Sequence, residues 1–297
     1  MLINDRLITA MITPFLDNGD LDIETSKKLA ISLTKSGSDA ILIGGTTGES
    51  PALSDDEKLE LFKNVKDAVG DNARVIAGTT DNNNKKSIEL SIEAESLGVD
   101  GLLLTVPSYN KPTQQGLIDH FNKIADSVNI PCILYNVPGR TALNMEAETT
   151  HKLSFHENII GIKEASSDLS QITKIINNSS NSDFKVWSGN DDEIFSIMAL
   201  GGFGVVSVAS NIIGNQIKTM MGAVLEGNIE SAANHHKELL PLFKALFWIT
   251  NPILIKRALN ISGYSVGGLR LPMIDSKEFD LEFSELLSKY DIDITKT

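Results

Sequence analysis

The sequence has little of what would connect it to an oxidising compartment, a membrane or a nucleic acid. It contains one cysteine, Cys132, which excludes an intrachain disulfide framework. No apolar run approaches the roughly 18 residues of a membrane-spanning helix, and the N-terminus lacks a basic start followed by an apolar stretch. We therefore expect a cytoplasmic protein with no membrane segment.

Positive charge and metal-binding motifs are also scarce. The 297 residues include 26 Lys and Arg against 39 Asp and Glu, and the net charge of −13 argues against a nucleic acid as partner. The five histidines show no His-x-His or HExxH spacing at a strand end, and His235 and His236 are adjacent on a predicted helix, so their side chains diverge. We predict no metal site.

The chain does contain eight short apolar runs with starts about 20 to 35 residues apart, which is the room that a strand–helix–strand crossover needs. The runs are continuously apolar rather than alternating, as expected for a parallel sheet covered on both faces. They are residues 7–13, 40–45, 74–78, 101–106, 132–137, 159–164, 185–189 and 205–209.

Amphipathic segments with helix start and stop signals lie between these runs. Ser54 and Glu57 form a predicted capping box, and a helix over residues 87–97 is predicted to stop at Gly98. We predict an α/β fold, a (β/α)8 barrel over residues 1–225 with a C-terminal helical region over 226–297 packed on it. A doubly wound open sheet is the alternative architecture.

Lys163 is the sharpest candidate for chemistry. It ends an apolar run, where desolvation would disfavour the ammonium and leave a neutral amine able to attack a ketone. The competing interpretation is a structural lysine paired with the adjacent carboxylate of Glu164. Tyr135 ends another run and could carry protons for such an attack, although a lone tyrosine is more often a core residue.

Two further features could bind a carboxylate. The Gly-rich segment over residues 44–48 contains Thr46 and Thr47, and its backbone N–H groups and hydroxyls suit a bound anion. Arg140 follows Tyr135 by five residues, and a guanidinium is a natural bidentate partner for a carboxylate, unless it is only a surface arginine.

Three segments together resemble the signature sequences of the dihydrodipicolinate synthases, class I aldolases of the N-acetylneuraminate lyase superfamily. They are GGTTGES at residues 44–50, YNVPGRT at 135–141 and GIKEA at 161–165. The resemblance extends over nearly the whole chain. It implies a (β/α)8 barrel with a C-terminal helical region, assembled as a homotetramer or homodimer.

The resemblance also implies a catalytic set that needs no cofactor. Lys163 corresponds to the lysine that forms a Schiff base with pyruvate, and Tyr135 to the tyrosine that donates and accepts protons. Thr46 corresponds to the relay threonine beside that tyrosine. Tyr109 corresponds to the relay tyrosine that the family contributes across a subunit interface.

The substrate-binding positions follow in the same way. Thr47 matches the residue that binds the pyruvate carboxylate, and Arg140 the arginine that holds the carboxylate of L-aspartate semialdehyde. Gly189 and Val206 fall where the pocket wall contacts pyruvate. The implied reaction is condensation of these two substrates to 4-hydroxy-tetrahydrodipicolinate, the first committed step of diaminopimelate and lysine synthesis.

Two other functions remain open at this point. A different pyruvate-dependent aldolase, such as N-acetylneuraminate lyase or a keto-deoxy sugar-acid aldolase, would share Lys163 and Tyr135. Arg140 and the Thr46–Thr47 pair favour the synthase, because sialic-acid lyases usually lack the arginine and often place Ser first. A non-catalytic binding barrel is the remote alternative.

Relatives that are inhibited by lysine bind it in a pocket at the tight dimer interface. Two of the matching positions here keep the pocket's residues, whereas four depart from them, and a lysine at the glutamate position reverses the charge that would pair with the effector. The resemblance therefore predicts weak or absent inhibition by free lysine. The kept residues are Ser50 and Asn82, and the departures are Asp55, Lys58, Lys86 and Ser108.

Overall fold

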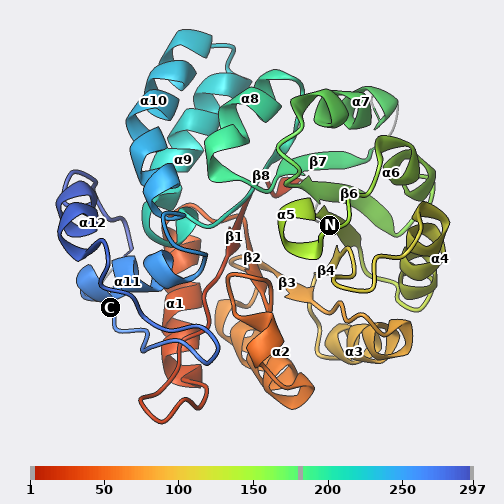
Figure 1. Cartoon of the computed structure of the whole chain (residues 1–297), viewed down its shortest axis with the longest axis horizontal. Coiled ribbons are helices and arrows are strands. Elements are labelled where there is room, and N and C mark those ends of the chain that lie inside the picture. Colours follow the sequence, from red (N-terminus) through yellow and green to blue (C-terminus); the bar gives the residue numbers. More distant parts are fainter. Residues whose placement is uncertain (1–3, 180–182, 295–297) are drawn as a thin grey trace.

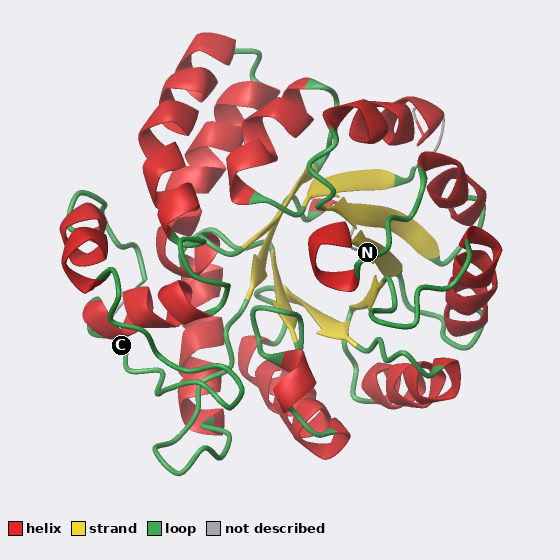
Figure 2. Cartoon of the chain, viewed as in Figure 1, coloured by secondary structure: helices red, strands yellow, loops and turns green. Residues whose placement is uncertain are grey.

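Eight parallel strands close into a barrel in sequence order, and helices surround it (Figures 1 and 2). The computed structural model describes residues 4–179 and 183–294, so the first three residues of the N-terminus considered above lie outside it. The predicted (β/α)8 barrel is confirmed, and the open sheet is excluded because β1 pairs with β8. The strands are β1 (Leu7–Ala10), β2 (Ala40–Ile43), β3 (Arg74–Gly78), β4 (Gly101–Thr105), β5 (Cys132–Asn136), β6 (Ile159–Glu164), β7 (Lys185–Ser188) and β8 (Gly204–Ser207).

The helices alternate with the strands and continue after β8. They are α1 (Ile23–Lys35), α2 (Asp55–Val69), α3 (Asn84–Ser96), α4 (Gln114–Ala125), α5 (Pro138–Thr141), α6 (Ala147–Leu153), α7 (Leu169–Ser179), α8 (Ile194–Ala199), α9 (Ser210–Leu225), α10 (Ile229–Ala245), α11 (Ile253–Ile261) and α12 (Asp280–Leu287). The short α5 follows β5 directly and lies across the barrel opening in Figure 1.

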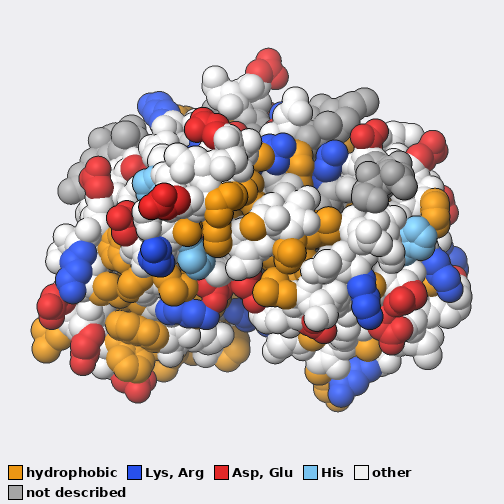
Figure 3. Space-filling view, turned by 90° about the horizontal axis from the view of Figure 1, so that it is seen from above, with side chains coloured by type: hydrophobic (Ala, Val, Ile, Leu, Met, Phe, Trp, Pro, Cys, Tyr) orange, Lys and Arg blue, Asp and Glu red, His pale blue; other side chains and the backbone are white. Residues whose placement is uncertain are grey.

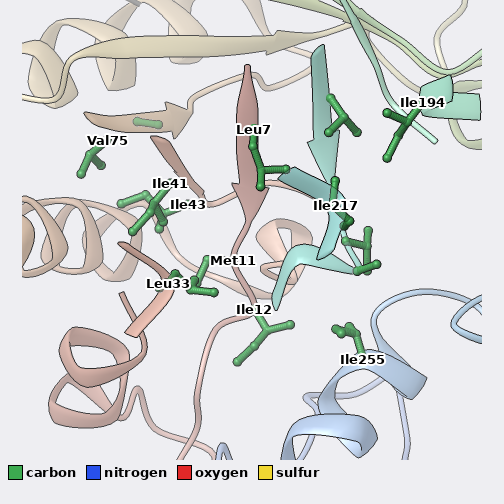
Figure 4. Packing of buried hydrophobic residues seen from close by; sticks show 14 of the residues in the cluster. Leu7, Met11, Ile12, Leu33, Ile41, Ile43, Val75, Ile194, Ile217 and Ile255 are labelled. Atoms are coloured by element: carbon green, nitrogen blue, oxygen red, sulfur yellow. The ribbon is translucent and has the colours of Figure 1, made fainter. Parts of the chain in front are cut away.

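Side chains of each strand alternate between two hydrophobic cores. Ala40 and Leu42 of β2 point into the barrel with Ile8 and Ile133. Ile41 and Ile43 point outward into the larger core between the strands and the helices, where Leu7 and Val75 join them (Figure 4). Both faces of the sheet are therefore buried, which explains why the strands are continuously apolar.

Helix ends follow the capping chemistry of the sequence. The predicted capping box is confirmed, because Glu57 N donates to Ser54 Oγ at 3.2 Å and Ser54 N donates to Glu57 Oε2 at 2.9 Å. The helix predicted over 87–97 begins three residues earlier, since the Asn83 side chain caps α3 by accepting from Lys85 N. Gly98 follows α3 with φ of +81°, as a C-terminal glycine should.

The last three helices form a group on one side of the barrel, with α10 against α9 (Figure 1). Acidic and basic side chains are interspersed over the face seen in Figure 3. Among the described residues, no helix is both long enough and apolar enough to cross a membrane.

Candidate active site

The carboxyl ends of β5 and β6 bring Lys163 and Tyr135 together. The two residues are register partners on adjacent strands, and Lys163 Nζ lies 4.2 Å from the centroid of the Tyr135 ring. Each is only 5% exposed. Because an amine beside a phenol ring in a water-poor site can exchange protons with few competitors, this pair is suited to nucleophilic chemistry.

Burial sets the protonation of Lys163. Desolvation lowers the pKa of its ammonium to about 7. The nearby Asp191 carboxylate acts in the raising direction, and Arg140 makes a smaller lowering contribution. The adjacent Glu164 points elsewhere: its carboxylate accepts from Asn136 Nδ2 and from Ser166 N. No ion pair joins Lys163 to Glu164 among the described residues, so the interpretation of Lys163 as a paired structural lysine is wrong.

Tyr135 stays a neutral phenol at physiological pH. Desolvation raises its pKa to about 12, although Arg140 and a hydrogen bond with the Thr46 side chain act in the lowering direction. Thr46 belongs to the loop after β2, which Gly44 opens with φ of +64°, a conformation that favours glycine. The Thr46 side chain therefore lies beside Tyr135.

The two candidate carboxylate-binding residues lie at different depths. Thr47 is buried, and its hydroxyl accepts a hydrogen bond of 2.9 Å from Asn251 Nδ2. Arg140 is exposed on α5, and its Nη2 donates to the Asn251 carbonyl oxygen at 3.3 Å. Arg140 and Thr46 line a cavity of about 320 Å³ that extends to Ser108. Lys163 and Tyr135 do not line that cavity.

Gly189 and Val206 occupy the wall of the barrel interior. A Cβ added at Gly189 would lie 3.2 Å from Lys163 Cε and 2.7 Å from Ala165 Cβ, so the absence of a side chain leaves room for the lysine. Val206 of β8 is buried in the inner core that also contains Tyr135.

Tyr109 is the one candidate that a single chain does not bring to this site. It lies in the loop after β4, is 92% exposed and has φ of +69°, which is uncommon for a bulky residue. Within the described residues, Tyr109 joins none of the contacts made by Lys163, Tyr135 and Thr46.

Sequence reasoning missed two buried polar residues. Asp191 is 2% exposed, and its Oδ2 accepts from Val208 N at 3.1 Å and from Ala209 N at 2.9 Å. Its position just after β7 was a usable signal, because carboxylates at a strand end can set the charge of a neighbouring lysine. Asn251 is 4% exposed and lies two residues before α11, where no sequence signal indicated a role in the site.

Within residues 4–179 and 183–294, no group of three or more His, Cys, Asp or Glu side chains could hold a metal ion. The groups that could act on a substrate are the amine, phenol, hydroxyl and guanidinium described above. Their chemistry is that of addition to a carbonyl and proton transfer.

Comparisons with known proteins find matches over nearly the whole chain. Residues 4–289 match the Dihydrodipicolinate synthetase family. The 4-hydroxy-tetrahydrodipicolinate synthase of Dehalococcoides mccartyi (strain CBDB1) is 51% identical over 290 residues, which cover 97% of each chain. The crystal structure of dihydrodipicolinate synthase from Cyanidioschyzon merolae with lysine bound has a TM-score of 0.93 at 43% identity and covers 97% of each chain. A monomeric dihydrodipicolinate synthase variant has a TM-score of 0.92 at 40% identity and covers 97% of this chain and 95% of that one.

Proposed function

The chain belongs to the dihydrodipicolinate synthetase family, and from this premise we propose that Lys163 carries a pyruvate imine that condenses with L-aspartate semialdehyde. The observation that supports the proposal most strongly is the buried Lys163 amine, with a pKa of about 7, over the Tyr135 ring. Names of curated relatives at 50–51% identity favour the synthase over other pyruvate-dependent aldolases.

The first half-reaction forms the imine. The neutral Lys163 amine attacks the ketone carbon of pyruvate, and a C–N bond forms while the carbonyl oxygen takes a proton through Tyr135. Loss of that oxygen as water leaves the imine, and no external cofactor is consumed. Thr47 holds the pyruvate carboxylate, with Gly189 and Val206 as the pocket wall.

The second half-reaction makes the carbon–carbon bond. Loss of a methyl proton converts the imine to an enamine, whose carbon attacks the aldehyde, and the aldehyde oxygen becomes a hydroxyl. The amino group of the second substrate then attacks the imine carbon, which closes the ring and releases Lys163. Arg140 holds the second carboxylate, because a guanidinium matches a carboxylate bidentately.

Proton transfer in both halves needs a relay. The Thr46 side chain already lies beside Tyr135. We propose that Tyr109 of the partner subunit completes the relay, since the tyrosine is exposed in the single chain. This role requires a homodimer or a homotetramer, which we propose as the assembly, in the cytoplasm. We also retain the proposed division into a barrel over 1–225 and a helical region over 226–297.

A coupled assay tests the reaction. Purified protein is given pyruvate with L-aspartate semialdehyde, and product formation is followed through its reduction by NADPH with excess reductase. The matched arm supplies N-acetylneuraminate and measures released pyruvate. We expect turnover in the first arm only. Cleavage of the sialic acid with no condensation would overturn the proposal in favour of a lyase.

A further inference from the structure

Asn251 connects the two residues that we assign to the two substrate carboxylates. It lies in the segment between α10 and α11 and is only 4% exposed. Its Nδ2 donates to Thr47 Oγ1 at 2.9 Å, and its backbone carbonyl accepts from Arg140 Nη2 at 3.3 Å. A residue of the C-terminal region therefore contacts the site, although it lies 204 positions after Thr47 in the sequence.

A buried ion pair fixes Asn251 relative to the loop that contains Thr47. Lys256 Nζ lies 2.6 Å from Glu49 Oε1, and both side chains are 2% exposed. The same ammonium lies 4.1 Å from the centroid of the Phe15 ring. Glu49 is two residues after Thr47, and Lys256 is five residues after Asn251. Because the two segments are joined at two points, neither can slide along the other without breaking a buried polar contact.

The direction of the hydrogen bond determines what the Thr47 hydroxyl can do. A threonine hydroxyl has one hydrogen to donate and two lone pairs that accept. The amide N–H of Asn251 occupies one lone pair, which leaves the hydroxyl hydrogen available for a carboxylate oxygen. The Asn251 Oδ1 atom is buried without a hydrogen-bond partner among the described residues, so Nδ2 alone holds this amide in place.

We propose that Asn251 is a positioning residue that turns the Thr47 hydroxyl hydrogen toward the carboxylate of the 2-oxo acid substrate. The inference rests on the proposed function and deepens it. This role makes the C-terminal helical region part of substrate recognition, because Asn251 lies in that region and orients the hydroxyl that binds the carboxylate of the ketone.

Two variants at position 251 separate the direction of the hydrogen bond to Thr47 from its presence. Asn251→Asp keeps the size but has only acceptor oxygens when ionised, so it would draw the Thr47 hydrogen away from the substrate and add a negative charge. We expect the KM for pyruvate to rise about 100-fold in Asn251→Asp and about tenfold in Asn251→Ala, since a charge-assisted hydrogen bond is lost. The kcat should stay within about threefold, as expected when ground-state binding is weakened.

The second substrate supplies an internal control. Asn251→Ala keeps the backbone carbonyl that accepts from Arg140 and adds no charge near that guanidinium, so its KM for L-aspartate semialdehyde should not change. A merely structural role would instead lower kcat and the melting temperature together. Asn260→Asp is the matched control, because this asparagine of α11 bonds Gly267 O and Val266 N and touches none of the site residues.

A double-mutant cycle with Thr47→Val completes the experiment. If Asn251 acts through the hydroxyl, Asn251→Ala should add little to the pyruvate KM of Thr47→Val. A pyruvate KM within twofold of wild type in folded Asn251→Asp would overturn the inference, as would full additivity in the cycle. If Asn251→Ala does not fold, the near-isosteric Asn251→Asp carries the same test.

The two proposals fail in different ways. A wild-type enzyme that forms no covalent adduct with pyruvate would refute the imine on Lys163. An adduct in the wild type together with an unchanged pyruvate KM in the Asn251 variants would refute only the positioning role.

Discussion

Imine formation on Lys163 should respond to pH near neutrality. Burial holds the pKa of this ammonium at about 7 instead of its usual value of 10.5. At pH 7, an amine with a pKa of 10.5 is neutral in roughly 0.03% of molecules, whereas a pKa of about 7 makes about half of them neutral, a gain on the order of a thousandfold. Because only the neutral amine attacks, the rate should fall about tenfold per pH unit below about pH 6 and level off above about pH 8.

Single-turnover trapping measures this profile. The enzyme is mixed with pyruvate and cyanoborohydride between about pH 5 and pH 10, and intact mass follows the adduct over time. Tyr135, with a pKa of about 12, stays protonated over this range, and the pyruvate carboxylate stays ionised, so neither group shapes the profile near neutrality. A rate that still rises tenfold per unit from about pH 8 to pH 10 would refute the reasoning, since it would indicate an ordinary lysine.

Three other changes test separate parts of the account. Arg140→Ala should lower kcat/KM for L-aspartate semialdehyde by the equivalent of about 1.5–3 kcal/mol and leave pyruvate trapping intact; unchanged steady-state constants would place the second carboxylate elsewhere. Lys256→Met should destabilise the protein by about 3–5 kcal/mol, because the buried Glu49 carboxylate loses its cation. Glu49→Gln/Lys256→Met should recover part of the lost melting temperature, whereas a double variant as unstable as the sum of the singles would contradict the pairing. Free lysine should inhibit weakly or not at all, because Lys86 would repel its ammonium; half-inhibition below about 1 mM at saturating pyruvate would contradict this.

The apolar runs of the sequence predicted the strands well where the buried residues are also hydrogen-bonded to a neighbouring strand. Seven of the eight strands begin at the predicted residue, and β8 begins one residue earlier, at Gly204. The first apolar run extends to Thr13, yet β1 ends at Ala10, because residues 11–13 are buried as a loop rather than paired as a strand. Hydrophobicity indicates burial, and it cannot tell a buried loop from the end of a strand.

The same limit applies to the site. Lys163 and Tyr135 were predictable as neighbours because parallel strands present their carboxyl ends at one edge. The contact between Asn251 and Thr47 was not, since it joins segments 204 residues apart and follows no periodic pattern. Tyr109 differs again, because it is exposed in one chain and its proposed role depends on a second copy.

The central claim is that Lys163 carries the pyruvate imine. The most direct test incubates the protein with pyruvate and borohydride and then measures intact mass and the modified peptide. Wild type and the exposed-lysine control Lys174→Ala should each gain one reduced pyruvate adduct, located on Lys163, and Lys163→Ala should gain none. An undiminished adduct in Lys163→Ala, or an adduct located on another lysine of the wild type, would contradict the account.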